Sequence, residues 1–350
     1  MDFLQSNYAP VKTTFRSFSD TFYDILPSAT ELNFAVGYIT SDSLIELQKL
    51  IEYNNIQKMN LTIGMHYLDK FTKTEYDTAM GLNEYLTRTG KGEVRLVTPF
   101  RYHGKLYSYS TKNGPFAGII GSNNLSSITG GMSRIYESAV LIDDIQMASD
   151  MYRFIQQLNS TASSNISELD IHQFRSFNGL LEDLDNVSSV DASTLADVRN
   201  HLTDIYFDIP IKGYEASPQS NLNVFFGKGR ESKNGLVKPR HWYEVELIVP
   251  KNITSRAYYP QSQTPGAVFD VITDDGWQFK CKVSGDYSKN FRSEGDLKIL
   301  GKWLKGRLEN AGVLSVGQPV TQNTLSKYGR NTFTLRKTKI DNLWYLDFGV

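Results

Sequence analysis

Apolar residues in the first part of the chain recur with two different periods, which predicts strands and helices in alternation. Every second residue of segment 31–40 is apolar, as in a strand with one buried face. Segment 43–51 has apolar residues at helical spacing and opens with a capping-box pattern at Ser43–Glu46. The same periods predict strands at 61–65, 94–97, 103–109, 116–121 and 134–142, and helices at 72–87 and 143–158. Strands and helices in this order favour an α/β sandwich built on a mixed sheet.

The pattern changes after residue 160 and again near residue 205. Polar runs occupy residues 160–165 and 188–191. Helices are predicted at 174–184, between the two runs, and at 192–205, after the second run. Beyond them, short strands are predicted at 242–249, 267–272, 277–283, 331–336 and 343–348, with one basic amphipathic helix at 297–308. We therefore expect three parts: an α/β domain at 1–160, a helical linker at 161–204, and a mainly β domain, a small barrel, at 205–350.

Charge is distributed unevenly between the two halves of the chain. The net charge is −1, but residues 205–350 carry 21 Lys and Arg against 14 Asp and Glu, whereas residues 1–204 carry 16 against 24. This asymmetry indicates that the second half meets a polyanion, although chance surface variation produces similar differences.

Composition narrows the protein class further. The single cysteine, Cys281, excludes an internal disulfide and a cysteine-built zinc site, and it fits a reducing cytoplasm. No run approaches the roughly 20 apolar residues of a membrane span, and Met1–Pro10 does not have the pattern of a signal peptide. We expect a cytoplasmic protein with no membrane partner.

Two short motifs carry the candidate chemistry. His103 and Lys105 are two positions apart on a predicted strand and would therefore share one face. An imidazole can attack phosphorus, and a neighbouring ammonium neutralises the phosphate oxygens. Ser122 and Asn124 follow the next predicted strand and can supply hydroxyl and amide donors to the same oxygens. Glu137, on the strand after that, can orient an imidazole.

The two motifs together resemble the H-x-K-x4-D-x6-G-S-x-N signature of the phospholipase D superfamily. His103, Lys105, Gly121, Ser122 and Asn124 match it, whereas Ser110 stands where the family usually has Asp. The resemblance implies a phospholipase-D-like fold, a phosphohistidine intermediate, and no metal or other cofactor. It also implies two histidines per reaction. Because the chain has one such motif, the site would be shared across a homodimer. The other histidines (His66, His172, His201 and His241) lack a Lys two positions later and are expected to be packing or surface residues.

The second half resembles the C-terminal domain of the NgoFVII-like restriction endonucleases, relatives of the BfiI-type enzymes. The matching segments are NLNVFFGKGRESKNGLVKPR at 221–240, VFDVITDDGWQFKC at 268–281, LGKWLKGRL at 300–308 and LSKYGRNTFTLRK at 325–337. The resemblance covers nearly the whole chain and implies a B3-like β-pseudobarrel. It further implies that the protein recognises a short GC-rich site in double-stranded DNA.

Two polar segments are the candidate DNA-reading arms, a first arm at 225–240 and a second arm at 284–298. Arg can read guanine through two hydrogen bonds, and an acidic side chain can accept from cytosine. The arm residues are Lys228, Arg230, Glu231, Lys233, Lys238, Arg240, Lys289, Asn290, Arg292 and Asp296. Lys302, Lys305 and Arg307 on the predicted basic helix are candidates for phosphate contacts. Each of these side chains has the alternative of being a solvated surface charge.

The sequence therefore predicts a site-specific, metal-independent deoxyribonuclease of a restriction-modification system, with a cognate DNA methyltransferase as partner. Several alternatives remain open. The chain could be a non-enzymatic B3-like regulator, or a cleavage subunit that works only with an ATP-dependent helicase-like partner, since it has no phosphate-binding loop of its own. A lipid-hydrolysing phospholipase D would not explain the basic second half. A metal-dependent site on Glu231-Ser232-Lys233 lacks a preceding strand Asp.

Overall fold

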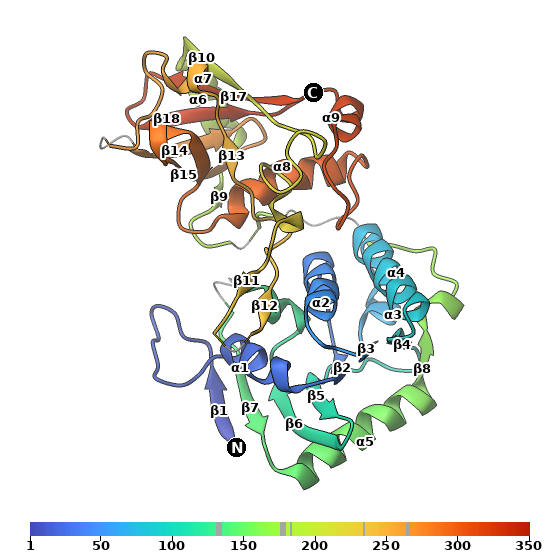
Figure 1. Cartoon of the computed structure of the whole chain (residues 1–350). Coiled ribbons are helices and arrows are strands. Elements are labelled where there is room, and N and C mark those ends of the chain that lie inside the picture. Colours follow the sequence, from blue (N-terminus) through green and yellow to red (C-terminus); the bar gives the residue numbers. More distant parts are fainter. Residues whose placement is uncertain (131–134, 176–179, 183, 234, 264–266) are drawn as a thin grey trace. The chain divides into compact units, whose positions relative to one another are not determined.

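The computed structural model describes residues 1–350 apart from 131–134, 176–179, 183, 234 and 264–266. The chain forms two compact units (Figure 1). The first comprises Met1–Phe177 together with Gly229–Pro239, and the second comprises Asn178–Lys228 and Arg240–Val350. Each unit contains its own large sheet.

The first unit is an eight-stranded mixed sheet with helices on both faces. The strand order is β1-β7-β6-β5-β2-β3-β4-β8, in which β2, β3 and β4 run parallel and every other pairing is antiparallel. The strands are β1 Asp2–Gln5, β2 Glu31–Val36, β3 Lys58–Ile63, β4 Gly92–Val97, β5 Leu106–Thr111, β6 Gly114–Gly121, β7 Ser138–Ile142 and β8 Ser163–Asn165. The helices are α1 Phe18–Ile25, η1 Leu26–Ser28, α2 Ser41–Tyr53, α3 His66–Asp69, α4 Lys73–Arg88, η2 Leu125–Thr129, α5 Ile145–Ala162 and η3 Ile166–Glu168.

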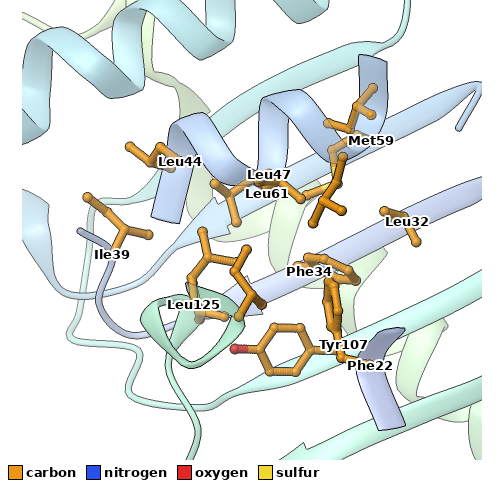
Figure 2. Close-up of a cluster of buried hydrophobic side chains, with 14 of the residues drawn as sticks. Phe22, Leu32, Phe34, Ile39, Leu44, Leu47, Met59, Leu61, Tyr107 and Leu125 are labelled. Atoms are coloured by element: carbon orange, nitrogen blue, oxygen red, sulfur yellow. The ribbon is translucent and has the colours of Figure 1, made fainter. Parts of the chain in front are cut away.

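Apolar side chains cover both faces of this sheet. On one face Phe22, Phe34 and Tyr107 pack ring against ring beneath the leucines of α2 (Figure 2), and each is fully buried. On the other face lies α5, whose apolar side chains (Ala148, Met151, Ile155 and Leu158) are all buried. Each large apolar side chain removed from water contributes about 1.5–3 kcal/mol, so burial on the two faces holds the helices against the sheet.

The predicted α/β sandwich with a mixed sheet is confirmed, with differences at element ends. Helix α2 begins one turn before the predicted capping box: Thr40 is the N-cap, and its backbone N–H donates to Ser43 Oγ (3.1 Å). Strand β5 begins at Leu106, so His103 and Lys105 precede the strand instead of lying on it. Likewise Glu137 lies just before β7, and the start of the predicted strand 134–142 falls outside the described residues.

A short hairpin from the first predicted DNA-reading arm is part of the first unit. Its strands are β11 Arg230–Glu231 and β12 Val237–Lys238. Leu236 is 3% exposed and belongs to the hydrophobic cluster of the sheet. The Asn54 side chain at the end of α2 forms two hydrogen bonds with the Val237 backbone, accepting from its N–H (3.1 Å) and donating to its C=O (3.2 Å). The sequence-based boundary at residue 205 therefore does not describe this hairpin.

The second unit is built on a curled sheet with the order β10-β17-β18-β14-β15-β16-β13, to which β9 adds beside β15. The strands are β9 Ser188–Ser189, β10 Leu202–Pro210, β13 Leu247–Ile248, β14 Val268–Thr273, β15 Trp277–Ser284, β16 Asn290–Ser293, β17 Thr332–Thr338 and β18 Leu343–Asp347. The helices are α6 Ala192–Asn200, η4 Val224–Phe226, α7 Lys251–Thr254, η6 Asp286–Ser288, α8 Lys298–Asn310 and α9 Gln322–Tyr328. The predicted mainly β domain is confirmed, and α8 matches the predicted basic helix at 297–308. Helices α7 and α9 were not predicted, and only Leu247–Ile248 of the predicted strand 242–249 form a strand.

Local signals account for the central hairpin of this unit and for part of the linker. Gly276 has φ +87° in the Asp275-Gly276 turn between β14 and β15, a conformation that glycine adopts without strain. Helix α6 confirms the second linker helix over 192–200, whereas residues 202–205 of the same prediction belong to strand β10. Of the first, predicted at 174–184, residues 176–179 and 183 lie outside the described residues, while Arg175 forms a bridge with Thr72 and residues 180–182 form a turn.

The hairpin generates a stability prediction. We expect Leu236→Ala to lower the free energy of unfolding of the first unit by about 2–5 kcal/mol, because it leaves a cavity in that core. Hydrogen exchange of the β2 and β3 amides would report the first unit. Tryptophan fluorescence would report the second, which contains all four tryptophans (Trp242, Trp277, Trp303 and Trp344).

The matched control is Lys233→Ala, an exposed position of the same hairpin, which should change neither signal. A Leu236→Ala protein whose amide exchange in β2 and β3 equals that of the wild type would contradict the assignment of the hairpin to the first core.

Candidate active site

The strand directions bring the candidate catalytic residues to one edge of the first sheet, here called the active-site edge. Strand β5 runs antiparallel to β2, with Leu106 opposite Ala35, so the segment before β5 meets the end of β2. Strand β6 ends at Gly121, which is paired with Ala139 at the start of β7. His103, Lys105, Ser122, Asn124 and Glu137 therefore all leave the sheet at this edge.

His103 and Lys105 contact each other directly. Lys105 Nζ lies 3.1 Å from both His103 Nδ1 and Nε2, and it donates to the His103 carbonyl oxygen at 2.8 Å. A neutral imidazole has one N–H and one acceptor nitrogen, and the acceptor nitrogen is the one that can act as a nucleophile. The predicted contact between imidazole and ammonium is present. It arises because the Lys105 side chain folds back over the loop that precedes β5, and not because the two residues share one face of a strand.

Asn124 reaches the same place from the end of β6. Its Oδ1 accepts a hydrogen bond from the backbone N–H of Tyr38 (3.1 Å). A Cβ atom at Gly37 would lie 3.2 Å from His103 Cδ2 and 3.5 Å from Asn124 Oδ1, so both side chains pack against the same glycine. Because Oδ1 is held by the backbone, the Asn124 Nδ2 group is left as the donor available to an anion.

Close backbone approach at two glycines permits this arrangement. A Cβ at Gly64 would lie 1.9 Å from the Tyr102 carbonyl oxygen, and a Cβ at Gly121 would lie 2.4 Å from that of Ser138. Only glycine fits where backbone lies so close. Gly64 therefore lets the His103 segment lie against the end of β3, and Gly121 brings the Ser122–Asn124 turn against β7.

Ser122 and Glu137 flank this centre. Ser122 Oγ accepts from the Ser138 N–H (3.0 Å) and donates to its carbonyl (3.3 Å), and the residue is exposed. The Glu137 backbone forms two 2.9 Å hydrogen bonds with Ser6, one of them to Ser6 Oγ, which fix its place before β7. Ser122 can donate to a bound anion only by giving up its contact with Ser138.

Burial and charge act in opposite directions on the pKa of the candidate catalytic lysine, Lys105. Lys105 is only 6% exposed, and this desolvation lowers its pKa from the ordinary value. The charge of Glu137 acts the other way and raises the pKa of Lys105. An ammonium in such a place has been stripped of most of its water and interacts strongly with an incoming phosphate.

Ser110 stands far from this centre. It is 2% exposed and pairs with Glu31 at the opposite end of β5. Five residues of extended chain separate it from Lys105, roughly 16 Å. The replacement of the usual Asp at this position therefore leaves the geometry of the active-site edge unaffected.

His66 is a packing residue, as expected. Its ring lies 4.6 Å from that of Phe71 and the residue is 1% exposed. Desolvation lowers the pKa of His66 to about 4, with the nearby Glu75 opposing the shift. It is therefore uncharged at neutral pH.

The candidate DNA-reading residues are distributed over both units. In the first unit, Arg230, Glu231 and Lys233 of the hairpin are exposed, whereas Lys238 Nζ lies 4.0 Å from the centre of the Tyr23 ring. The remaining ones belong to the second unit: Lys228 is exposed, and Arg240, Lys289, Asn290, Arg292, Asp296, Lys302 and Arg307 are half-buried.

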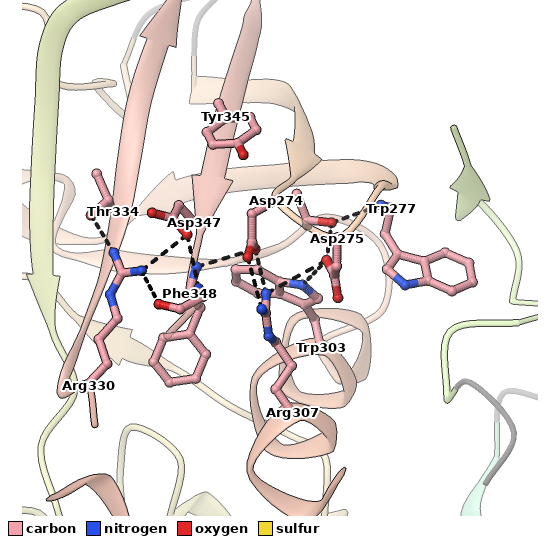
Figure 3. Close-up of polar contacts among 12 residues, drawn as sticks. Asp274, Asp275, Trp277, Trp303, Arg307, Arg330, Thr334, Tyr345, Asp347 and Phe348 are labelled. Atoms are coloured by element: carbon pink, nitrogen blue, oxygen red, sulfur yellow. Dashed lines mark hydrogen bonds and ion pairs between the residues drawn. The ribbon is translucent and has the colours of Figure 1, made fainter. Parts of the chain in front are cut away.

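Three of the basic candidates are tied into the second unit by strong contacts. Arg240 forms two hydrogen bonds with Glu244, and Arg307 forms a pair with Asp274 through both terminal nitrogens (Figure 3). A phosphate contact at either guanidinium would compete with these pairs. The prediction that Lys305 contacts phosphate is wrong, because Lys305 is fully buried. Its Nζ donates to the Trp242 carbonyl oxygen (2.5 Å) and lies 3.7 Å from the centre of the Trp242 ring.

Two family models match the chain, one on each part. The model for the NgoFVII restriction endonuclease N-terminal PLD domain matches residues 16–171, and the model for the NgoFVII C-terminal B3-like DNA-binding domain matches residues 197–339. The two matches occur in the predicted order and together span most of the sequence. The chain belongs to the NgoFVII-like restriction endonucleases. It is a phosphodiesterase that acts as a nuclease on DNA. The hairpin at Gly229–Pro239 lies within the B3-like match although it packs in the first unit.

Solved structures similar to this NgoFVII-like chain share little sequence with it. NucT from Helicobacter pylori is 16% identical (TM-score 0.32; 46% of this chain, 98% of that one). The phospholipase D family member Nuc from Salmonella typhimurium is 14% identical (TM-score 0.30; 47% and 98%). The phosphatidylserine synthase of Haemophilus influenzae Rd KW20 is also 14% identical (TM-score 0.34; 48% and 41%). No curated protein matches the sequence.

Among the described residues there is neither a candidate membrane span nor a group of candidate metal ligands. No helix among them is long and apolar enough to cross a membrane. In the same part of the chain, no three His, Cys, Asp or Glu side chains are grouped as metal ligands would be.

His66 generates a prediction about acid stability. Because its pKa is near 4 in the folded protein and about 6.5 when unfolded, the unfolded state binds the extra proton between these values. Stability should therefore fall as the pH is lowered from 6.5 to 4, by up to about 1.4 kcal/mol per pH unit from this residue alone. Urea unfolding of His66→Phe should lack this part of the pH dependence. His172→Phe, at an exposed position, serves as the control, and equal slopes for His66→Phe and wild type would refute the assignment.

Proposed function

We propose that this NgoFVII-like enzyme cleaves double-stranded DNA at a specific site without a metal ion, through a phosphohistidine intermediate. The observation that carries the proposal is the convergence of His103, Lys105 and Asn124 at the active-site edge, with Lys105 Nζ 3.1 Å from the imidazole nitrogens. An imidazole nucleophile beside a desolvated ammonium and an amide donor is suited to attack a phosphodiester.

In the first step, a ring nitrogen of His103 attacks the phosphorus. A nitrogen–phosphorus bond forms and the bond from phosphorus to the leaving oxygen breaks. Lys105 and the Asn124 Nδ2 group donate to the non-bridging oxygens, where negative charge concentrates in the transition state. Glu137 keeps Lys105 protonated, and Ser122 adds a donor when its contact with Ser138 opens.

A second histidine is needed to donate a proton to the leaving oxygen. No second His-x-Lys motif occurs in the sequence, so we assign this role to His103 of the partner subunit in a homodimer formed through the nuclease domain. In the second step that histidine removes a proton from water. The water oxygen then attacks phosphorus, the nitrogen–phosphorus bond breaks, and both histidines return to their initial states.

Site recognition is assigned to the B3-like domain. The two arms contain both Arg and acidic side chains, which can read guanine and cytosine edges, so a GC-rich target is favoured. In a restriction-modification system such an enzyme acts in the cytoplasm beside a DNA methyltransferase that protects the same site. An ATP-dependent helicase-like subunit would be a further partner if purified protein cleaves only with ATP. The alternative, a DNA-binding regulator, would not depend on His103.

The central test uses purified protein and plasmid DNA in the presence of EDTA, with and without ATP. The wild type should cleave, and His103→Ala should lose about 10³-fold or more of the cleavage rate because the nucleophile is removed. The same variant should still bind DNA in a gel-shift assay. His172→Ala, an exposed histidine, should behave as wild type. Undiminished cleavage by His103→Ala, or cleavage abolished by EDTA, would contradict the mechanism.

The electrostatics of Lys105 predict the alkaline limb of the pH profile. Activity requires the ammonium form and is lost as the pH rises through the lowered pKa of Lys105. Glu137→Gln removes a charge that raises this pKa, so the limb should move to lower pH. The measurement is kcat/KM for bis(p-nitrophenyl) phosphate against pH, with the exposed Glu84→Gln as control. A limb that stays in place or moves to higher pH in Glu137→Gln would contradict the proposed role.

A further inference from the structure

Three side chains at the active-site edge have no part in the chemistry described above. Tyr38 follows β2, Asp69 ends α3 after β3, and Arg101 follows β4. These three strands are parallel neighbours, so their carboxyl ends lie side by side at the active-site edge. None of the three belongs to either of the two sequence motifs.

Asp69 is held by the other two side chains. The Tyr38 hydroxyl donates to Asp69 Oδ2 (2.7 Å), and Arg101 Nε donates to Asp69 Oδ1 (2.7 Å). These two hydrogen bonds lower the pKa of Asp69, so it is ionised at neutral pH. Both carboxylate oxygens are thus engaged, and the negative charge faces a guanidinium.

Tyr38 connects this group to the catalytic residues. Its backbone N–H donates to Asn124 Oδ1, and its ring meets the His103 ring edge to face at 5.8 Å. Arg101 itself lies two residues before His103. Arg101 is therefore linked to His103 both along the chain and through Asp69 and Tyr38.

The guanidinium of Arg101 is placed differently from those of Arg240 and Arg307. Arg240 and Arg307 each form two hydrogen bonds with a carboxylate, and their side chains are 26% and 19% exposed. Arg101 contacts Asp69 through Nε alone, and its side chain is 59% exposed. Within the described part of the chain its two terminal nitrogens have no such contact. A guanidinium fixed at Nε presents these nitrogens as a fork, the geometry suited to a phosphate.

We propose that Arg101 binds the DNA phosphate adjacent to the scissile one, and that Asp69 and Tyr38 position its guanidinium. The inference rests on the proposed function and assigns a substrate contact that the reaction itself does not require. The competing interpretation is that Arg101 and Asp69 form an ordinary surface ion pair, which would contribute little to stability and nothing to DNA cleavage.

The test compares two substrates that differ in the number of phosphates. A duplex containing the cleavage site offers the neighbouring phosphate, whereas bis(p-nitrophenyl) phosphate has only the reacting one. Arg101→Ala should lower kcat/KM for the duplex about 10- to 100-fold, the range for a charged hydrogen bond to phosphate. Its rate with bis(p-nitrophenyl) phosphate should remain within about twofold of wild type.

Two further readouts separate a phosphate contact from a structural role. In Arg101→Ala, the plot of the logarithm of the DNA-binding constant against the logarithm of the salt concentration should become less steep by about 1, the change expected for loss of one phosphate contact. Arg101→Lys keeps the charge but not the fork, so it should retain an intermediate rate with DNA. Asp69→Asn should show a smaller loss, confined to the duplex substrate, because it loosens the guanidinium without removing it.

Arg153→Ala is the matched control, because Arg153 on α5 also pairs with an acid, Asp150, and is 68% exposed. It should equal wild type with both substrates. The proposal is overturned if Arg101→Ala cleaves the duplex at the wild-type rate, or if it loses both activities in equal measure. Failure of the proposed function has a different signature, namely a His103→Ala protein that still hydrolyses both substrates.

Discussion

The active site depends on the direction of the strands in the first sheet. Three parallel strands end at the edge where β5 and β7, which run the opposite way, begin. Loops that are distant in sequence must therefore meet there, and together they contribute their polar side chains to the same region. Without this mixed pairing, the His103 segment and the Asn124 turn would leave the sheet at opposite edges. Burial of aromatic and aliphatic side chains on both faces stabilises the sheet and hence the site.

Close contacts then convert this convergence into a defined geometry. Glycines at 64 and 121 let backbone approach backbone, and the Tyr38 N–H fixes the amide of Asn124. Lys105 is desolvated between the imidazole and the start of β5, so its charge is set close to where a phosphate would bind. Such preorganisation matters because the groups need not reorient when negative charge develops in the transition state.

Much of this could be predicted from the sequence, and the failures have physical causes. The apolar periods locate most of the strands and helices, and the two motifs select His103, Lys105 and Asn124. The expected reason for the His103–Lys105 contact was wrong, since both residues precede β5 and meet through a folded loop. Tyr38, Asp69 and Arg101 carry no local signal, because only strand pairing brings them together. The hairpin around Leu236 follows the same rule: its place in the first core depends on contacts across more than 180 residues.

The central claim is that His103 forms a covalent bond to phosphorus during DNA cleavage. The most direct measurement is mass spectrometry of peptides from enzyme quenched under alkaline conditions, in which phosphohistidine survives, while it turns over its DNA substrate. The account predicts a phosphoryl-linked nucleotide on the peptide that contains His103, formed and lost at rates that match turnover. Steady turnover with no adduct on that peptide, or with an adduct on Ser122 instead, would contradict it.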